Sequence, residues 1–319
     1  MPTIGVCILN YQAALETIAC VRSLLDAQEL ATGAYALRIE VADNASDEAD
    51  FTALQAGLDG LAGVYLHRHA RNLGFAAGHN RNIERLLSTA APDYVWLLNN
   101  DCLVDAGTIP ALLECANRRP EVGIWGATLL EADGRTIQCA GGCSYRVWLS
   151  SYRQHAHGID LSRLEALATP RFDYIAGASL FMPLATLREG LDPPKCRAPS
   201  LGRAWLNEEF FLYFEELDLA RRLRPGLEMA WCRKALVHHA GGSGTGSGQG
   251  LRSAEAEYHS TLSALKFTRL YHPGMLWLTA LARFAVKGTI HLASGRLDLF
   301  RALLRAYREF RAWLKLSPG

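Results

Sequence analysis

Three short groups of polar side chains, far apart in the sequence, have the residue types of a catalytic site. Each group follows or enters an apolar run, and the groups are Asn99-Asn100-Asp101, Glu215-Glu216 with Asp218, and His238-His239. A carboxylate, amide oxygens and an imidazole together can hold a divalent cation that keeps waters for a phosphate ligand. An imidazole ligand favours Mn²⁺ slightly over Mg²⁺. A carboxylate outside the metal group could then act as a general base.

The elements that would carry these groups can be predicted from the apolar pattern of the first 130 residues. Short apolar runs, typical of strands buried on both faces, alternate with stretches of helical spacing. The predicted strands are 3–10, 36–44, 63–69, 94–100 and 122–130, and the predicted helices are 12–30, 75–90 and 107–118. Strands joined by helical crossovers predict an α/β fold with a Rossmann-like, mostly parallel sheet and helices on both faces.

Polar side chains follow several predicted strands at the point where each strand ends. These side chains are Tyr11, Asp43-Asn44, Arg71-Asn72 and the group 99–101. Parallel sheets bind ligands beyond the carboxyl ends of their strands, so we expect these groups to converge on one edge. Asp43-Asn44 could instead cap a helix over 47–57, and the group 99–101 could be a simple turn.

The pattern becomes less regular after residue 130. Strands are predicted at 172–183 and 227–240, and an aromatic segment that enters a helix at 208–224. The Gly/Ser-rich stretch 241–250 is typical of a flexible linker. Helical spacing then predicts three helices near 251–270, 274–293 and 296–316. We therefore expect a catalytic domain over 1–250 and a helical C-terminal region over 251–319.

Several function classes lack their sequence signals. The net charge of +1 gives no whole-chain argument for nucleic-acid binding. No Gly-rich turn follows the first predicted strand, and neither a P-loop nor a GxSxG motif is present. None of the eight Cys is in CxxC spacing, which favours reduced, buried thiols in a cytoplasmic protein over a zinc site. We expect no signal peptide and no membrane span.

Five segments in order resemble the family 2 glycosyltransferases. They are "VADNAS" (41–46), "RNLGFAAGHNRNI" (71–83), "WLLNNDC" (96–102), "FFLYFEELDL" (210–219) and "VHHAGGS" (237–243). The resemblance covers roughly residues 3–245 and is strongest to bacterial rhamnosyltransferase-like enzymes of cell-surface polysaccharide synthesis. It implies a GT-A fold, a nucleotide-sugar donor of the dTDP or UDP type, a divalent metal ion and inversion at the anomeric carbon.

The resemblance also implies roles for individual residues. The donor side includes Asp43, Asn72 and Asn80, and with them we group the neighbouring Asn10, Tyr11, Arg81 and Asn100. Tyr11 could equally be a packing residue, and Arg81 a solvated one. The metal motif is Asn99 with Asp101, completed by His238 or His239, and the spacing to Ser243 favours His238. Glu216 matches the catalytic base, and Glu215 and Asp218 are alternatives for that role.

Two departures from the family pattern leave other functions open. Asn99 stands where a more acidic residue is usual, and Glu216 where Asp is usual, which lowers the charge at the metal and moves the base. A non-catalytic nucleotide-sugar-binding protein is therefore one alternative. A nucleotidyltransferase is another, although its usual Gly-rich N-terminal loop is absent. The favoured interpretation is transfer of a sugar, with rhamnose as a candidate, to a saccharide or lipid-linked acceptor.

The C-terminal region has a basic face. Residues 275–319 contain eight basic side chains and two acids, and 296–316 has an apolar stripe at helical spacing. Such helices can lie on anionic lipid, which would place the protein at the inner face of the cytoplasmic membrane. The other interpretation is packing against the catalytic domain or against another subunit of a homo-oligomer.

Overall fold

A computed structural model describes residues 1–195, 204–241 and 253–315 of the chain. The predicted linker 241–250 lies outside the described residues except for Gly241, and so do Cys196 and Ser243.

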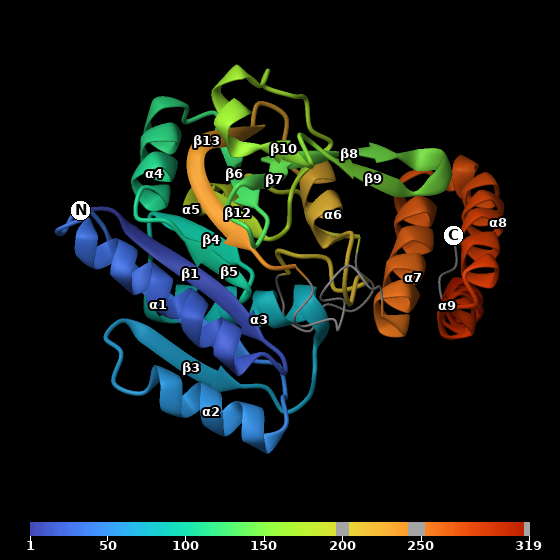
Figure 1. The fold of residues 1–319 in the computed structure, drawn as a ribbon, viewed down its shortest axis with the longest axis horizontal. Coiled ribbons are helices and arrows are strands. Elements are labelled where there is room, and N and C mark those ends of the chain that lie inside the picture. The colour runs from blue at the N-terminus through green and yellow to red at the C-terminus, as the bar shows by residue number, and fades with distance from the viewer. Residues whose placement is uncertain (196–203, 242–252, 316–319) are drawn as a thin grey trace.

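A large sheet forms the centre of the fold (Figure 1). Its strand order is β10-β7-β6-β12-β4-β1-β2-β3, with β13 beside both β6 and β5. The strands are β1 (Thr3–Asn10), β2 (Ala36–Asp43), β3 (Val64–Arg68), β4 (Tyr94–Leu98), β5 (Cys102–Val104), β6 (Val122–Leu130), β7 (Thr136–Ala140), β10 (Ile159–Asp160), β12 (Ser179–Pro183) and β13 (Glu228–His239). The predicted parallel pairing of the first four strands is confirmed. One difference is β12, which lies antiparallel between β4 and β6.

Helices cover both faces of this sheet, as predicted. Residues of α1, α2 and α4 pack into one hydrophobic core, and those of α3 and α5 into the other. The helices before the C-terminal region are α1 (Ala14–Leu30), α2 (Glu48–Leu58), α3 (Gly74–Thr89), α4 (Thr108–Arg118), α5 (Leu184–Glu189) and α6 (Glu215–Arg221). The chain therefore has a mixed α/β architecture in which parallel strands end at a common edge.

A small second sheet connects the central sheet to the C-terminal helices (Figure 1). It consists of β8 (Gly142–Arg146), β9 (Ser151–Gln154) and β11 (Tyr174–Ile175), and a 3-10 turn, η1 (Val147–Leu149), joins β8 to β9. The three predicted C-terminal helices are present as α7 (Ala254–Tyr271), α8 (Leu276–Ala293) and α9 (Leu297–Lys315). The Thr279 hydroxyl donates to the carbonyl of Val147, and the Ser263 hydroxyl to that of Leu212. These two hydrogen bonds connect α8 to the turn η1 and α7 to the segment before α6.

Candidate active site

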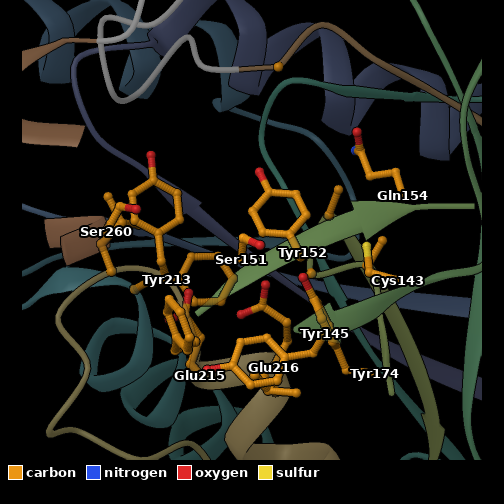
Figure 2. A pocket seen from close by; sticks show the side chains of 18 of the residues that line it. Cys143, Tyr145, Ser151, Tyr152, Gln154, Tyr174, Tyr213, Glu215, Glu216 and Ser260 are labelled. Atoms are coloured by element: carbon orange, nitrogen blue, oxygen red, sulfur yellow. The ribbon is translucent and has the colours of Figure 1, made fainter. Parts of the chain in front are cut away.

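A cavity of about 670 Å³ opens where the sheet edge, the β8–β9 hairpin and helices α7 and α8 meet. Asn99 and His239 line it from the ends of β4 and β13, and Glu215 and Glu216 line it from the start of α6. In Figure 2 the Glu216 carboxylate points into the cavity among the rings of Tyr145, Tyr152 and Tyr213. Asn99 and His239 of the predicted metal group therefore line the same cavity as Glu215 and Glu216 of the predicted acid group.

His239 is the imidazole that lies beside the metal motif. Its Nε2 is 3.3 Å from Asp101 Oδ1 and 3.3 Å from Asn99 Nδ2. Its Nδ1 is 2.6 Å from Oε1 of Gln138, whose own amide nitrogen lies 3.3 Å from Glu131 Oε2 and 3.2 Å from the carbonyl of His239. With Gln138 Oε1 as acceptor, the proton of the neutral ring is on Nδ1. The Nε2 lone pair then faces Asp101, which is the arrangement of a histidine metal ligand.

The sequence-based preference for His238 is corrected by this geometry. Successive side chains of β13 point to opposite faces, so only one of the two histidines can face the cavity. His238 instead pairs with Asp105, with Nε2 3.0 Å from the Asp105 carboxylate. The pairing of β13 with β5 sets this register, because His239 lies opposite Cys102 and His238 opposite Leu103.

The residues at this point fit a divalent cation. Among the described residues, Asp101, Cys102 and His239 place possible ligand atoms within 4.8 Å of one another. Cys102 is an unsuitable member, because its fully buried thiol donates to the carbonyl of Ala178 and burial raises its pKa well above the usual range. The remaining set has a carboxylate and an imidazole, with the Asn99 amide alongside, and suits Mn²⁺ or Mg²⁺ better than a thiolate-binding metal.

Glu216 has the chemical state of a general base. It is partly buried at the start of α6, and its side chain lies against Gly177 on the cavity wall. Burial raises its pKa from 4.5 to about 7, and backbone N–H groups of Glu216 and Phe214 oppose that rise. A carboxylate with a pKa near the working pH combines a substantial ionised fraction with basicity higher than that of an ordinary glutamate.

The two alternative acids differ from Glu216 in ways that assign them other roles. Burial and, after it, the neighbouring Glu216 charge raise the pKa of Glu215 well above its usual range, which favours its protonated form. Asp218 is fully buried and accepts hydrogen bonds from Asn207, Tyr271 and Arg222. It does not line the cavity. This carboxylate holds α6 in place, and its three hydrogen bonds favour Glu216 over Asp218 as the base, which stays a prediction.

The backbone before Glu216 has an unusual conformation. Tyr213 and Phe214 have positive φ angles of 68° and 76°, which are uncommon for aromatic residues. Both line the cavity, and they precede the two glutamates. Such a conformation persists only where surrounding contacts hold it, and it is often found at functional sites.

The predicted donor side contains a chain of buried hydrogen bonds. Asn100 donates to the Thr17 hydroxyl, Thr17 donates to Asn10, and Asn10 donates to Asp43. This chain links the ends of β4, β1 and β2, which confirms that these groups share one edge. Asn10 also donates to Ser46 and Asp50 and has no exposed surface, and its role toward the nucleotide stays a prediction.

Asp43 and the motif that follows β3 shape the same edge. The Asp43 carboxylate accepts hydrogen bonds from Asn10 and the Ser46 backbone and lies 3.3 Å from Arg68. A carboxylate has about four acceptor sites, so direct nucleotide contact by Asp43 stays a prediction. The Asn72 side chain accepts from Gly74 N and from Asn44, which orders the turn into α3. Its contact with a nucleotide also stays a prediction.

Asn80, which the sequence predicts on the donor side, is buried and bonded to residues 205–208. Its amide is fully buried, donates to the carbonyl of Leu206 and to Glu208, and accepts from the backbone N–H groups of Trp205 and Leu206. Its hydrogen-bonding capacity is therefore used within the protein. Direct nucleotide contact by Asn80 stays a prediction; in this structure the side chain attaches the 204–208 segment, which leads to Glu216, to α3.

Tyr11 and Arg81 remain accessible. The Tyr11 side chain is 37 % exposed, so packing alone does not account for it. Arg81 is also partly exposed, with a distant partner in Glu84 at 3.8 Å. Their roles toward a nucleotide, and that of Asn100 beyond its hydrogen bond to Thr17, stay predictions.

Sequence reasoning missed several residues of the cavity. They are Gln138, the tyrosines 145, 152 and 174, Ser260, Arg283 and Lys287. They come from the irregular region after residue 130 and from α7 and α8, and the motifs found in the sequence include none of them. The Gly141-Gly142 pair was a partial signal in the sequence, because paired glycines can mark a close approach of the backbone to another group. A Cβ on Gly141 would lie 2.7 Å from the Trp231 side chain, so this close approach requires glycine.

Comparisons with solved structures show that the chain has a GT-A fold. S. aureus TarS 1-349 in complex with UDP-GlcNAc superposes with a TM-score of 0.51 at 12% identity, over 97% of this chain and 80% of that one. GalNAc-T7 with UDP, GalNAc and Mn²⁺ also gives a TM-score of 0.51, at 14% identity, over 75% of this chain and 43% of that one.

The chain belongs to the family described as Glycosyltransferase like family 2, whose family model matches residues 2–257. It is 27% identical over 305 residues to the N-acetylglucosaminyl-diphospho-decaprenol L-rhamnosyltransferase of Mycobacterium tuberculosis (strain CDC 1551 / Oshkosh). The matched region covers 88% of each of the two chains. The protein is therefore a glycosyltransferase, and the family and fold expected from the five sequence segments are confirmed. The nucleotidyltransferase alternative is wrong.

Proposed function

We propose that this glycosyltransferase transfers a sugar from a nucleoside-diphosphate donor to a saccharide hydroxyl in one metal-dependent step that inverts the anomeric carbon. The observation that supports this proposal is the shared cavity, in which Asn99 and His239 lie on one wall and Glu216 on another. A single displacement needs a site for the leaving diphosphate and a base for the incoming alcohol. The cavity has a candidate for each.

In this proposal Glu216 takes the proton from the acceptor hydroxyl as that oxygen attacks C1 of the donor sugar. Glu215 remains neutral beside it, so the ionised Glu216 carboxylate has no second negative charge next to it. The rings of Tyr145, Tyr152 and Tyr213 around the carboxylate can pack against the faces of a sugar. We infer that these rings hold the acceptor.

Asp101 and His239 would hold the metal ion, with Asn99 beside them. The cation would neutralise the charge that develops on the departing nucleoside diphosphate. Gln138 keeps the His239 proton on Nδ1, so that Nε2 can ligate. Asn99 contributes no negative charge, and we therefore expect only moderate metal affinity.

The relatives suggest the substrate classes. The Mycobacterium tuberculosis relative is named for an L-rhamnosyl donor and a lipid-linked diphosphate acceptor that carries N-acetylglucosamine. We propose a similar pairing here: a dTDP- or UDP-linked sugar such as rhamnose, and a lipid-linked saccharide acceptor used in cell-surface polysaccharide synthesis. The reaction would take place at the cytoplasmic face of the membrane, because nucleotide sugars are cytoplasmic substrates.

A ligand screen followed by a transfer assay tests this proposal. Nucleoside diphosphates and their sugars would be added with Mn²⁺ or Mg²⁺, and the unfolding temperature measured, since a ligand of the native state raises it. We expect the largest shift with dTDP or UDP compounds and sugar transfer only with metal present. A response confined to adenine dinucleotides, or full transfer in a chelator, would contradict the proposal. Donor binding without turnover would favour the non-catalytic alternative.

A further inference from the structure

Helix α8 directs polar side chains toward the protein and apolar side chains toward solvent, which is the reverse of an ordinary surface helix. Its inward positions include Thr279, Arg283, Lys287 and His291. Its outward positions are apolar and highly exposed: Trp277 76%, Leu278 53%, Leu281 69%, Ile290 56% and Leu292 52%. A surface helix normally turns its apolar stripe toward the core and its charges toward water. The outer face of α8, defined here by those five side chains, therefore needs a separate explanation.

Hydrogen bonds and an ion pair fix the inward orientation. Lys287 Nζ lies 2.7 Å from both carboxylate oxygens of Glu257, which is fully buried on α7. Arg283 donates to the Ser260 carbonyl and hydroxyl and to the carbonyl of Ser150. A rotation of α8 that buried its apolar side would leave the Glu257 carboxylate buried without these partners, which is strongly unfavourable. The apolar face is thus held outward by the fold.

Exposed basic side chains lie on the helix that packs against α8, and an exposed tryptophan lies in the turn that contacts it. On the neighbouring helix α9, Arg301, Arg308, Arg311 and Lys315 are exposed, and none forms an ion pair with another described residue. Trp148, 49% exposed, lies in the turn η1 that packs on α8. Figure 1 shows α8 and α9 at one end of the long axis of the molecule, with α7 between them and the sheet.

We propose that the outer face of α8 inserts into the interfacial region of an anionic membrane, while the basic side chains of α9 bind lipid headgroups. Apolar residues beside arginines and lysines, with tryptophans at the boundary, suit a lipid–water interface. No helix in the described part of the chain is long and apolar enough to cross a membrane.

The charges favour a membrane over a second copy of this chain. A two-fold contact through α8 would bring the α9 cations of both copies to the same interface, where they would repel one another. Anionic phospholipids would neutralise the same cations. The opposite face of α8 lines the catalytic cavity through Arg283 and Lys287, so a membrane-bound α8 would stand between the bilayer and the cavity. The idea that this positions a lipid-linked acceptor depends on the proposed function; the membrane contact itself does not.

Vesicle binding by the full chain tests the proposal. Sedimentation with vesicles of phosphatidylethanolamine and phosphatidylglycerol would be compared for the native chain, the double variant Leu278→Ser/Leu281→Ser, and the control Leu15→Ser. Leu15 is a matched control because it is 75% exposed on α1, in another part of the fold. Full burial of one leucine changes a partition coefficient by about tenfold or more, so the double variant should bind about 100-fold less tightly. Leu15→Ser should bind normally.

Two further measurements complete the test. Charge reversal at Arg301 and Arg308 should weaken binding to these vesicles, and vesicles of phosphatidylcholine alone should bind the native chain poorly. Transfer to a water-soluble acceptor should be unchanged in the α8 variant, which separates a failure of this proposal from a failure of the proposed function. Equal vesicle binding by native and variant chains would overturn the proposal. So would a native dimer that does not bind vesicles and becomes monomeric in the variant.

Discussion

Replacement of Glu216 by Gln should abolish transfer and at the same time make the folded protein more stable above neutral pH. The carboxyl has a pKa of about 7 in the fold against an ordinary value of 4.5. A raised pKa means that the folded state favours the protonated form. Below pH 4.5 the Glu216 side chain is neutral in both states and costs nothing. As the pH rises from 4.5 to 7, ionisation becomes favourable only in the unfolded chain, so stability falls.

The size of this effect follows from the difference in pKa. About 2.5 pKa units at 1.36 kcal/mol each correspond to roughly 3 kcal/mol, present in full only above pH 7. Gln is neutral and nearly isosteric, so Glu216→Gln should avoid this cost. Urea unfolding of both proteins should give similar stabilities near pH 4.5, and a difference that grows toward about 3 kcal/mol at pH 8.

Activity should change in the opposite direction. A general base contributes about 10²- to 10⁴-fold, so kcat of Glu216→Gln should fall by that factor with little change in donor binding. In the native enzyme kcat/KM should rise about tenfold per pH unit up to about pH 7, as Glu216 ionises, and then level off. Glu215→Gln, the matched control, keeps a neutral side chain next to the base and should retain activity. Activity in Glu216→Gln with loss in Glu215→Gln would refute the assignment.

Four other substitutions test the supporting residues. Gln138→Ala should weaken Mn²⁺ binding about 10- to 100-fold, measured by metal titration of the unfolding temperature, whereas His238→Gln should leave that titration unchanged. Asn80→Ala leaves buried backbone groups of Trp205 and Leu206 without partners and should destabilise the fold by about 3 kcal/mol or more, with unchanged nucleotide affinity of the folded fraction. A selective loss of nucleotide affinity would instead support direct contact. Gly74→Ala should destabilise by about 2–4 kcal/mol in urea unfolding, because its φ is 78° and the new Cβ would lie 2.4 Å from Phe211 O; an unchanged midpoint would contradict this.

The first half of the fold could be predicted because each of its elements is specified locally. Apolar runs such as 3–10 and 122–130 identify buried strands, and the helical stretches between them require parallel pairing. The insertion of β12 between β4 and β6 was not predictable in this way. Its partners are 54 or more residues distant in the sequence, since Ser179 pairs with Leu98 and Leu180 with Gly126. The pattern of residues 172–183 predicts a strand, but it does not predict where that strand lies in the sheet.

The residue types of the candidate site could be predicted from the sequence, but the directions of its side chains could not. The groups 99–101, 215–216 and 238–239 were identified because their residue types suit metal binding and proton transfer. Which histidine faces the cavity depends on the register of β13 against β5, and two adjacent histidines carry no information on that register. Gln138 was missed for a related reason. A glutamine in a short strand has a role only through the partner that the fold places beside it.

The buried asparagines show a limit of motif reasoning. Asn80 lies in a segment that resembles nucleotide-binding motifs, and a polar residue near a strand end is reasonably expected to meet a ligand. Its complete burial and its four hydrogen bonds to 205–208 show another use of the same residue type. Sequence alone cannot separate these roles, because both need an amide that donates and accepts at once.

The attachments of the segment that precedes Glu216 explain how a strained backbone can hold the proposed base in place. Asn80 fixes 205–206, and the N–H of Phe75 donates to the carbonyl of Phe211 at 2.7 Å. Both contacts come from α3, the helix that begins beside the predicted nucleotide edge. Residues 213–214, with their positive φ angles, are then bounded by α3 on one side and by α6 on the other. A shift of α3 would therefore reach Glu216 through the hydrogen bonds of Asn80 and Phe75 and the short stretch of chain that follows them.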